Sequence, residues 1–168
     1  YFHTWNVKRI RPSAFTPYDL DRENYTRLLW AFEGITSYYD DLALVRSGLV
    51  DVASWLELAG RQISAVLRTP GRRRQSVAES SFDAWIKYYR QDENTPNAVV
   101  SYYAKGALVG LALDLTLREA GGKLVPESPS RGDSPLMLAQ IVRAVPANDL
   151  GLFGKISVYL SRWKEFLV

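Results

Sequence analysis

Residues 98–119 read AVVSYYAKGALVGLALDLTLRE, and this stretch decides the fold. A helix built from it is apolar on nearly every side, which at this length is typical of a central helix packed all round. Its most apolar part, residues 98–113, is shorter than the roughly 20 residues that cross a bilayer, and it contains Lys105. Gly106 and Gly110 lie four residues apart and predict a close approach by another helix. We therefore expect a buried core helix and no membrane span.

The rest of the chain also repeats its apolar positions at helical spacing. The pattern predicts helices near residues 25–46, 52–67 and 82–89, and a polar loop at residues 91–97. No segment of more than a few residues alternates convincingly as a half-buried strand does. The sequence therefore predicts a mainly α fold.

Capping residues predict where these helices begin and end. The first has Asp21 or Asn24 as its N-cap and Gly48 just past its last residue. The third has Ser80 and Asp83 at the spacing of a capping box. The apolar side chains of the third helix share one face, and these are Phe82, Trp85, Ile86 and Tyr89.

Composition limits the class of protein. The chain has 168 residues, 47% of them hydrophobic, which suffices for one globular domain with a sizeable core. A net charge of +3 does not require a nucleic acid partner, and we expect none. Cysteine is missing and His3 is the single histidine, so any metal must be held by histidine, aspartate or glutamate. No signal peptide opens the sequence, which leaves the compartment open between cytoplasm and periplasm.

Polar side chains stand out at three places in these apolar patterns. His3 lies between aromatic residues near the start of the chain, and Glu33 lies within an apolar helical face. Tyr102, Tyr103 and Lys105 place hydroxyls and an ammonium in the most apolar helix. Such groups are either hydrogen-bonded to the structure or kept for function. A lone histidine is most often a core or capping residue, and the residues alone leave its role open.

Taken together, these places resemble the glycyl aminopeptidase family of zinc metallopeptidases, which belongs to the gluzincin clan. Three blocks in the right order carry the resemblance: YFHTWNVKRIRP at residues 1–12, ENYTRLLWAFEGITSYYDDL at residues 23–42 and DENTPNAVVSYYAKGAL at residues 92–108. The resemblance covers residues 1–123. It implies the helical, C-terminal half of a thermolysin-like zinc peptidase catalytic domain.

The resemblance implies roles for three residues of this chain, and helical spacing suggests a fourth. In the family, YFH is the second half of an H-E-x-x-H helix, in which two histidines bind zinc and the glutamate is the general base. The resemblance implies that His3 is the second zinc-binding histidine and that Glu33, in the E-G-x-T-x-Y block, is the third ligand. It implies that Tyr103, in the Y-x-K-G block, holds the developing oxyanion. Asp40, seven residues after Glu33 on nearly the same helical face, either orients a ligand or is a surface carboxylate paired with a lysine or arginine.

The implied activity is removal of N-terminal Gly or Ala from peptides, with Zn²⁺ as cofactor and a peptide as substrate. This chain lacks the first zinc histidine and the glutamate base, so we expect it to be an inactive fragment, and its own zinc content stays open. We expect self-association through surface exposed by truncation. The alternative is a non-catalytic helical interaction module derived from a peptidase.

The composition changes near residue 124. Prolines among serines predict a linker there, followed by helical segments that do not match the family pattern. The predicted organisation is therefore a partial catalytic domain over residues 1–123 and a linker with a divergent helical segment over residues 124–168.

Overall fold

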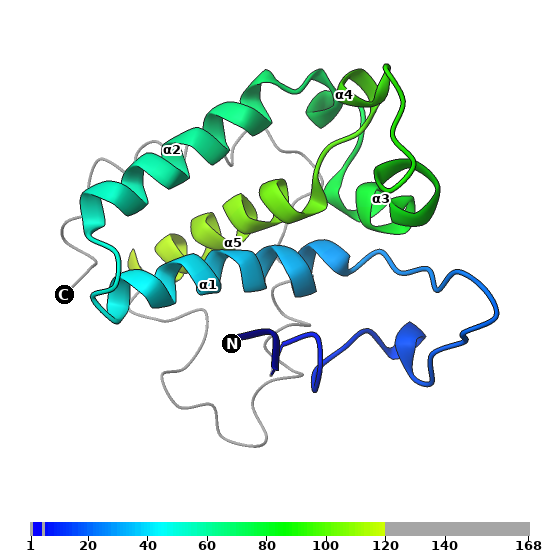
Figure 1. Cartoon of the computed structure of the whole chain (residues 1–168), viewed down its shortest axis with the longest axis horizontal. Helices are drawn as coiled ribbons and strands as arrows, with labels where there is room; N and C mark the ends of the chain where they lie inside the picture. The colour runs from blue at the N-terminus through cyan, green and yellow to red at the C-terminus, as the bar shows by residue number, and fades with distance from the viewer. Residues whose placement is uncertain (1, 5, 120–168) are drawn as a thin grey trace. The chain divides into compact units, whose positions relative to one another are not determined.

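Helices and helical turns form the regular structure of the computed structural model, which describes residues 2–4 and 6–119 (Figure 1). In chain order these are the 3₁₀ turns η1 (Phe2–Thr4) and η2 (Ser13–Phe15), the π-helical turn η3 (Trp30–Gly34), the helices α1 (Ile35–Arg46) and α2 (Val52–Arg68), the 3₁₀ turn η4 (Pro70–Arg73), the helix α3 (Val77–Phe82), the π-helical turn η5 (Ala84–Tyr88), and the helices α4 (Thr95–Ala98) and α5 (Tyr102–Glu119). Among the described residues, β-pairing is limited to an isolated bridge between Asn6 and Ile10. The predicted mainly α fold is confirmed.

The chain divides into two units, Tyr1–Ala107 and Leu108–Val168. Every contact discussed below lies in the first unit. Of the second unit the structure describes residues 108–119, which continue α5. The predicted linker and helical segment over residues 124–168 lie outside the described residues.

The first long helix begins later than predicted. Helical backbone starts at η3 rather than near residue 25, and neither Asp21 nor Asn24 caps it. Asn24 instead closes the preceding loop, because its side chain accepts from the Asp19 amide at 3.0 Å and donates to the Asp19 carbonyl at 2.6 Å. The predicted end is confirmed, since Gly48 follows α1 with a φ of 73°, a conformation that favours glycine.

Helix α2 agrees with the prediction for residues 52–67. Asp51 caps it by accepting a hydrogen bond from the Ser54 amide at 2.7 Å. One stripe of the helix is buried at Trp55, Ala59 and Val66, while Leu67 at its end is exposed. Figure 1 shows α2 running antiparallel to α1 after a short turn, and the two helices pack together.

The third helix also starts at a different place. Its capping box is formed by Ser76 and Glu79 instead of Ser80 and Asp83. Ser80 is buried and its hydroxyl donates to the carbonyl of Val100, so it is not available to cap the helix. The predicted helix over residues 82–89 is instead the π-helical turn η5, and the α-helix before it, α3, ends at Phe82.

The apolar face predicted for this helix is exposed. Trp85 is 46% exposed and Tyr89 is 58% exposed. Tyr25 extends the face, because its ring packs against that of Phe82 with centroids 5.1 Å apart. We call this surface the aromatic face; its members are Tyr25, Phe82, Trp85, Ile86 and Tyr89.

Helix α5 is the predicted central helix, but it begins at Tyr102 rather than at residue 98. Two hydrogen bonds explain the delay, since Val100 donates its amide to the Gln75 side chain and accepts from Ser80, so its backbone is not available to the helix. The preceding predicted loop contains the single turn α4.

The window Thr95–Leu115 is long and apolar enough to cross a membrane by length and composition alone. However, 72% of this window is buried inside the structure. A core helix passes the same test, and the burial agrees with the predicted core helix.

Candidate active site

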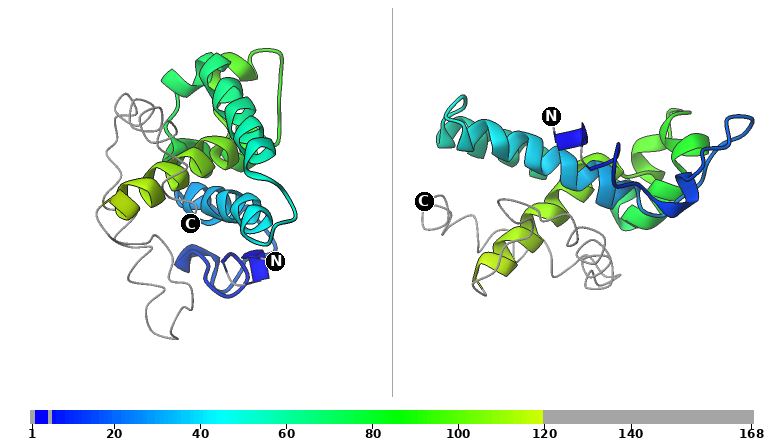
Figure 2. Two further views of the ribbon diagram at one scale, coloured as in Figure 1. Left: turned by 90° about the vertical axis from the view of Figure 1, so that its left-hand side faces the viewer. Right: turned by 90° about the horizontal axis from the view of Figure 1, so that it is seen from below.

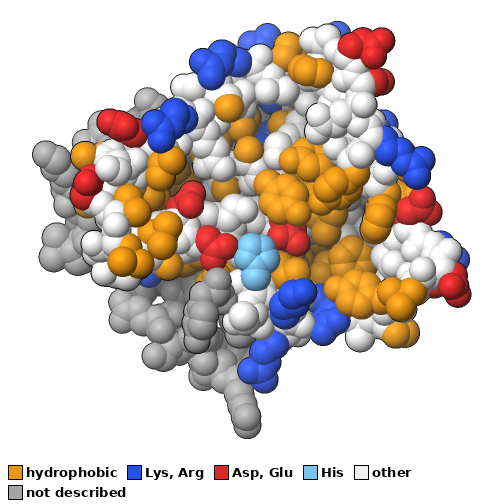
Figure 3. Space-filling model, viewed as in Figure 1, with side chains coloured by type: hydrophobic (Ala, Val, Ile, Leu, Met, Phe, Trp, Pro, Cys, Tyr) orange, Lys and Arg blue, Asp and Glu red, His pale blue; other side chains and the backbone are white. Residues whose placement is uncertain are grey.

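His3 lies between two carboxylates. Its Nε2 atom is 3.1 Å from Oε2 of Glu33, and its Nδ1 atom is 3.1 Å from Oδ2 of Asp40. Glu33 lies in η3 and Asp40 two turns further along α1, so both side chains project from one side of the same helical rod. Figure 3 shows the pale blue histidine at the surface between red carboxylate side chains, and its side chain is 44% exposed.

The N-terminal segment is fixed against α1 on both sides of His3. On one side, the Phe2 ring stacks on Tyr39 with centroids 5.0 Å apart. On the other side, buried Asn6 donates from Nδ2 to the Phe32 carbonyl at 3.0 Å and to the Thr36 hydroxyl at 2.9 Å. Figures 1 and 2 both show this segment running beside α1. The two anchors hold the imidazole over Glu33, although the residues are 30 apart in sequence.

Glycines bring a second group of side chains to the same place. A Cβ atom on Gly34 would lie 2.6 Å from the Gly106 backbone, and one on Gly106 would lie 2.7 Å from the Trp30 carbonyl. The π-helical turn η3 and the beginning of α5 therefore touch backbone to backbone, as the glycine at position 106 predicts. Glu33 and Tyr103 lie beside this contact on the two elements.

Tyr103 belongs to a cluster of phenols. The Tyr89 hydroxyl is 2.8 Å from the Tyr102 hydroxyl and 3.3 Å from the Tyr103 hydroxyl. Burial raises the pKa of Tyr103, and the negative charge of Glu33 raises that pKa as well. Tyr103 is therefore protonated at neutral pH and lies within electrostatic reach of Glu33, whereas the neighbouring Tyr102 is only 1% exposed.

Comparison with known proteins now identifies the family. The sequence model of the M61 glycyl aminopeptidases matches residues 1–109. This chain belongs to the M61 glycyl aminopeptidase family. The comparison with curated proteins found no match.

A solved structure resembles this M61 chain. It is the crystal structure of an aminopeptidase N family protein from Idiomarina loihiensis, with a TM-score of 0.73 and 42% sequence identity. The similarity covers 92% of the M61 chain and 28% of the other chain, so the M61 chain spans less than a third of that protein's length. The family and the helical peptidase fold predicted from the sequence are confirmed.

The His3–Glu33 pair of the M61 chain fits a zinc ion. Tetrahedral zinc binds a histidine nitrogen and a carboxylate oxygen at about 2.0–2.2 Å, which places two such ligand atoms about 3.3 Å apart. Nε2 of His3 and Oε2 of Glu33 are in direct hydrogen-bond contact at 3.1 Å, a distance close to that spacing. Among residues 2–4 and 6–119, no three His, Cys, Asp or Glu side chains form a metal-holding group. The described part of the chain therefore presents a pair of candidate ligands and not a complete site.

Lys105, the buried ammonium in the Y-x-K-G block, has a structural partner. It is fully buried, and its Nζ atom donates to the Arg72 carbonyl in η4 at 3.1 Å. Gly71 in the same turn packs directly on Val99, because a Cβ atom there would overlap the Val99 backbone. The lysine thus ties η4 to the first turn of α5 in the M61 fold.

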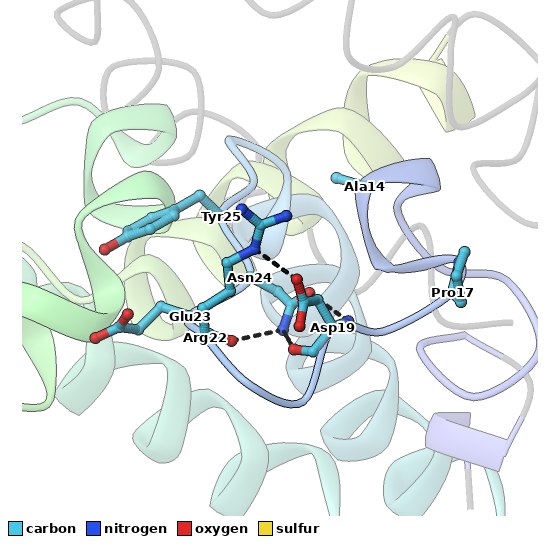
Figure 4. Close-up of a pocket in the computed structure, with 7 residues that line it drawn as sticks. All are labelled: Ala14, Pro17, Asp19, Arg22, Glu23, Asn24 and Tyr25. Atoms are coloured by element: carbon cyan, nitrogen blue, oxygen red, sulfur yellow. Dashed lines mark hydrogen bonds and ion pairs between the residues drawn. The ribbon is translucent and has the colours of Figure 1, made fainter.

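A separate pocket of about 410 Å³ lies in the loop before η3 (Figure 4). Its polar groups bond to one another, since Arg22 pairs with Asp19 at 2.6 Å and Asn24 bonds to the Asp19 backbone. The pocket shares no lining residue with the His3 site. Its full lining consists of Ala14, Pro17, Asp19, Arg22, Glu23, Asn24 and Tyr25.

Asn6 and Tyr89 are the parts of the site that the sequence reveals least. Asn6 lies among aromatic residues without a recognisable motif, and Tyr89 lies on a face that is typical of simple core packing. The sequence feature that could have indicated Asn6 is its position, since an asparagine stands three residues after the lone histidine. Tyr89 reaches Tyr103 only through the tertiary fold, so no local pattern reveals it.

Proposed function

We propose that this chain contributes two zinc ligands and the oxyanion-binding tyrosine to a metallo-aminopeptidase. The observation that carries the proposal is the 3.1 Å contact between His3 and Glu33, which fits two ligands of one zinc ion. Membership of the M61 glycyl aminopeptidase family supports it. When bound there, zinc supplies Lewis-acid activation of water and of the scissile carbonyl.

Asp40 sets the orientation of the imidazole. A proton on Nδ1 of His3 is donated to Oδ2 of Asp40 over 3.1 Å, which leaves the lone pair of Nε2 for the zinc ion that would be shared with Glu33. Carboxylates that hold metal-binding histidines in this way fix the tautomer and raise the basicity of the ligand. Asp40 is therefore an orienting residue in this proposal.

Tyr103 donates a hydrogen bond to the oxygen that becomes negative when the peptide carbonyl is attacked. Burial and the charge of Glu33 raise the pKa of Tyr103, so its proton is retained at neutral pH. A neutral phenol at this place is a donor that acts mainly when charge develops on the substrate.

The substrate proposed for the whole enzyme is a peptide with N-terminal Gly or Ala. The name of the family supports a small first residue. The 168-residue chain contains a single histidine, so a second imidazole ligand must come from residues outside it. We therefore propose that this chain by itself does not hydrolyse peptides.

The test uses the full-length peptidase that contains these residues. We expect stoichiometric zinc and release of glycine from a Gly-anilide. Glu33→Gln should lower the zinc content, while Tyr103→Phe should keep the zinc and lower kcat by about 10²–10³-fold. Wild-type activity in both variants would overturn these roles. The 168-residue chain assayed alone should release no glycine.

The alternative is a non-catalytic helical interaction module, and the exposed aromatic face favours it. The zinc measurement separates the two functions. If the protein is a non-catalytic interaction module, the full-length protein should neither retain zinc through Glu33 nor release glycine.

A further inference from the structure

Three phenols meet at one point beside the proposed zinc ligands. They come from two elements, since Tyr102 and Tyr103 open α5 and Tyr89 directly follows η5. The rings of Tyr102 and Tyr103 stack with centroids 4.4 Å apart, which brings their hydroxyls to the same side. The Tyr89 hydroxyl approaches both, at 2.8 Å and 3.3 Å.

The number of protons in this cluster restricts how the hydroxyls can bond. Each phenol has one proton to donate and can accept from its neighbours. Tyr102 is only 1% exposed, so its proton needs an acceptor inside the cluster. Tyr102 and Tyr103 are also within hydrogen-bond reach of each other, and either partner can donate in each of the two Tyr89 contacts. In the arrangement in which Tyr102 donates to Tyr89, the Tyr89 proton is left for the Tyr103 oxygen. Tyr103 then accepts a hydrogen bond and keeps its own proton unused.

We propose that Tyr89 is a positioning residue that donates to the Tyr103 oxygen and thereby aims the Tyr103 proton at the substrate oxyanion. The inference rests on the proposed function, because it deepens the role given there to Tyr103. Hydrogen bonds in a chain polarise one another, so a phenol that accepts one is a better donor to the next oxygen. The relay runs from Tyr102 through Tyr89 to Tyr103 and ends at the substrate.

The location of Tyr89 supports this role over a packing role. Its side chain is 58% exposed, so burial contributes little to holding it in place. Its ring contacts Tyr88 edge-on with centroids 5.4 Å apart, and its hydroxyl contacts two side chains of α5. The π-helical turn η5 adds one residue per turn relative to an α-helix and ends just before Tyr89.

Tyr88 provides a matched control. It also carries a phenol from η5, and its ring packs on Tyr102 at 5.0 Å. Its hydroxyl bonds to Ser101 at 3.2 Å instead of to the phenol cluster. Tyr88→Phe therefore removes a phenolic hydroxyl from the same turn without removing a link in the relay.

The kinetic test measures kcat and KM of the zinc-loaded full-length peptidase on a Gly-anilide. We expect Tyr89→Phe to lower kcat about tenfold with KM unchanged, which matches the loss of one hydrogen bond in the transition state. Tyr88→Phe should change neither constant. The double variant Tyr89→Phe/Tyr103→Phe should be no slower than Tyr103→Phe alone, because both changes remove the same donor.

A spectroscopic test reads the hydrogen bond directly. Labelling tyrosines with ¹³C at Cζ gives one NMR signal per phenol, and Tyr103→Phe assigns the signal of Tyr103. Tyr89→Phe should shift the Tyr103 signal, while Tyr88→Phe should leave it in place. An unshifted signal in Tyr89→Phe would overturn the inference.

The outcomes separate this inference from the proposed function. If Tyr103→Phe loses activity but Tyr89→Phe keeps wild-type kcat, the positioning role is wrong and the proposed function stands. If Tyr103→Phe itself keeps wild-type kcat, the role proposed for Tyr103 is wrong, and the role of Tyr89 falls with it.

Discussion

At the residue scale, the site depends on how one imidazole is held. His3 has a carboxylate on each ring nitrogen, Glu33 on Nε2 and Asp40 on Nδ1. The imidazole cannot turn over without breaking both contacts, and its backbone is fixed by the anchors at Phe2 and Asn6. A ligand atom held in this way is oriented before a metal arrives, which lowers the cost of binding it.

The first prediction concerns Asp40. Asp40→Asn should weaken zinc binding by about 10–100-fold, because the amide no longer accepts from the imidazole as strongly and the ring loses its orientation. Competition with a chelator on the full-length protein measures the affinity. Zinc affinity equal to that of the wild type would show that Asp40 is a surface carboxylate only.

Asp41→Asn is the matched control, since it removes the same charge from the next position of α1. Burial raises the pKa of Asp41, and the neighbouring charge of Asp40 raises that pKa further. Asp41 is not among the residues paired with His3, so the control should change zinc affinity by less than threefold.

At the element scale, backbone contacts decide which side chains meet. Gly34 and Gly106 let η3 touch the beginning of α5. Lys105, one residue before Gly106, ties the same part of α5 to η4 through the Arg72 carbonyl. The distance between Glu33 and Tyr103 is thus set by elements that cannot move apart without losing buried contacts.

The second prediction concerns this crossing. Gly106→Ala would place a Cβ atom 2.7 Å from the Trp30 carbonyl, so the two elements must shift. We expect a loss of about 1–3 kcal/mol in the free energy of unfolding, the usual cost of overpacking. Urea denaturation with an unchanged m-value measures it.

Gly60→Ala is the control, because it makes the same substitution at a helical position that does not lie at the contact between two elements. Gly60 lies in the middle of α2, and a Cβ atom there would meet nothing within 4 Å. We expect this variant to be more stable by about 0.5–1 kcal/mol, because glycine is a poor helix former. Equal effects of the two substitutions would contradict the role given to the crossing.

At the scale of the whole molecule, the aromatic face is an exposed apolar surface built from several neighbouring rings. Its rings support one another, since Tyr25 packs on Phe82 and Trp85 donates from its indole nitrogen to the Asn24 carbonyl. Contiguous apolar surface of this kind drives association in water. Figure 3 shows hydrophobic side chains gathered on the same side of the molecule as the histidine.

The third prediction is that the 168-residue chain self-associates through this face. Sedimentation velocity should show a mass that rises with concentration, and the double variant Trp85→Lys/Ile86→Lys should sediment as a monomer. Leu49→Lys is the control, because Leu49 is 76% exposed in the turn between α1 and α2 and is not part of the aromatic face. A wild-type chain that stays monomeric at all concentrations would contradict the prediction.

Much of the fold was predictable because it follows from local patterns. Helix α2 has a capping aspartate and a clear apolar stripe, and both agree with the structure. The helix boundaries that differ from the prediction were decided by long-range hydrogen bonds. One of them joins the Ser80 hydroxyl to the Val100 carbonyl, and Ser80 is the residue that the sequence pattern predicted as a helix cap. Exposure of Trp85 and Tyr89 was not predictable, since periodicity shows that residues share a face but not what covers that face.

The sequence by itself determined the family, the helical class and the identity of the residues proposed for the site, because blocks of residues in a set order carry that information locally. Only the tertiary structure decided that His3 meets both Glu33 and Asp40, and that Tyr89 reaches Tyr103. Those contacts join residues far apart in the chain, and their distances depend on how closely backbones can pack. That packing is set by the glycine crossing, by the anchored N-terminal segment and by the buried lysine acting together.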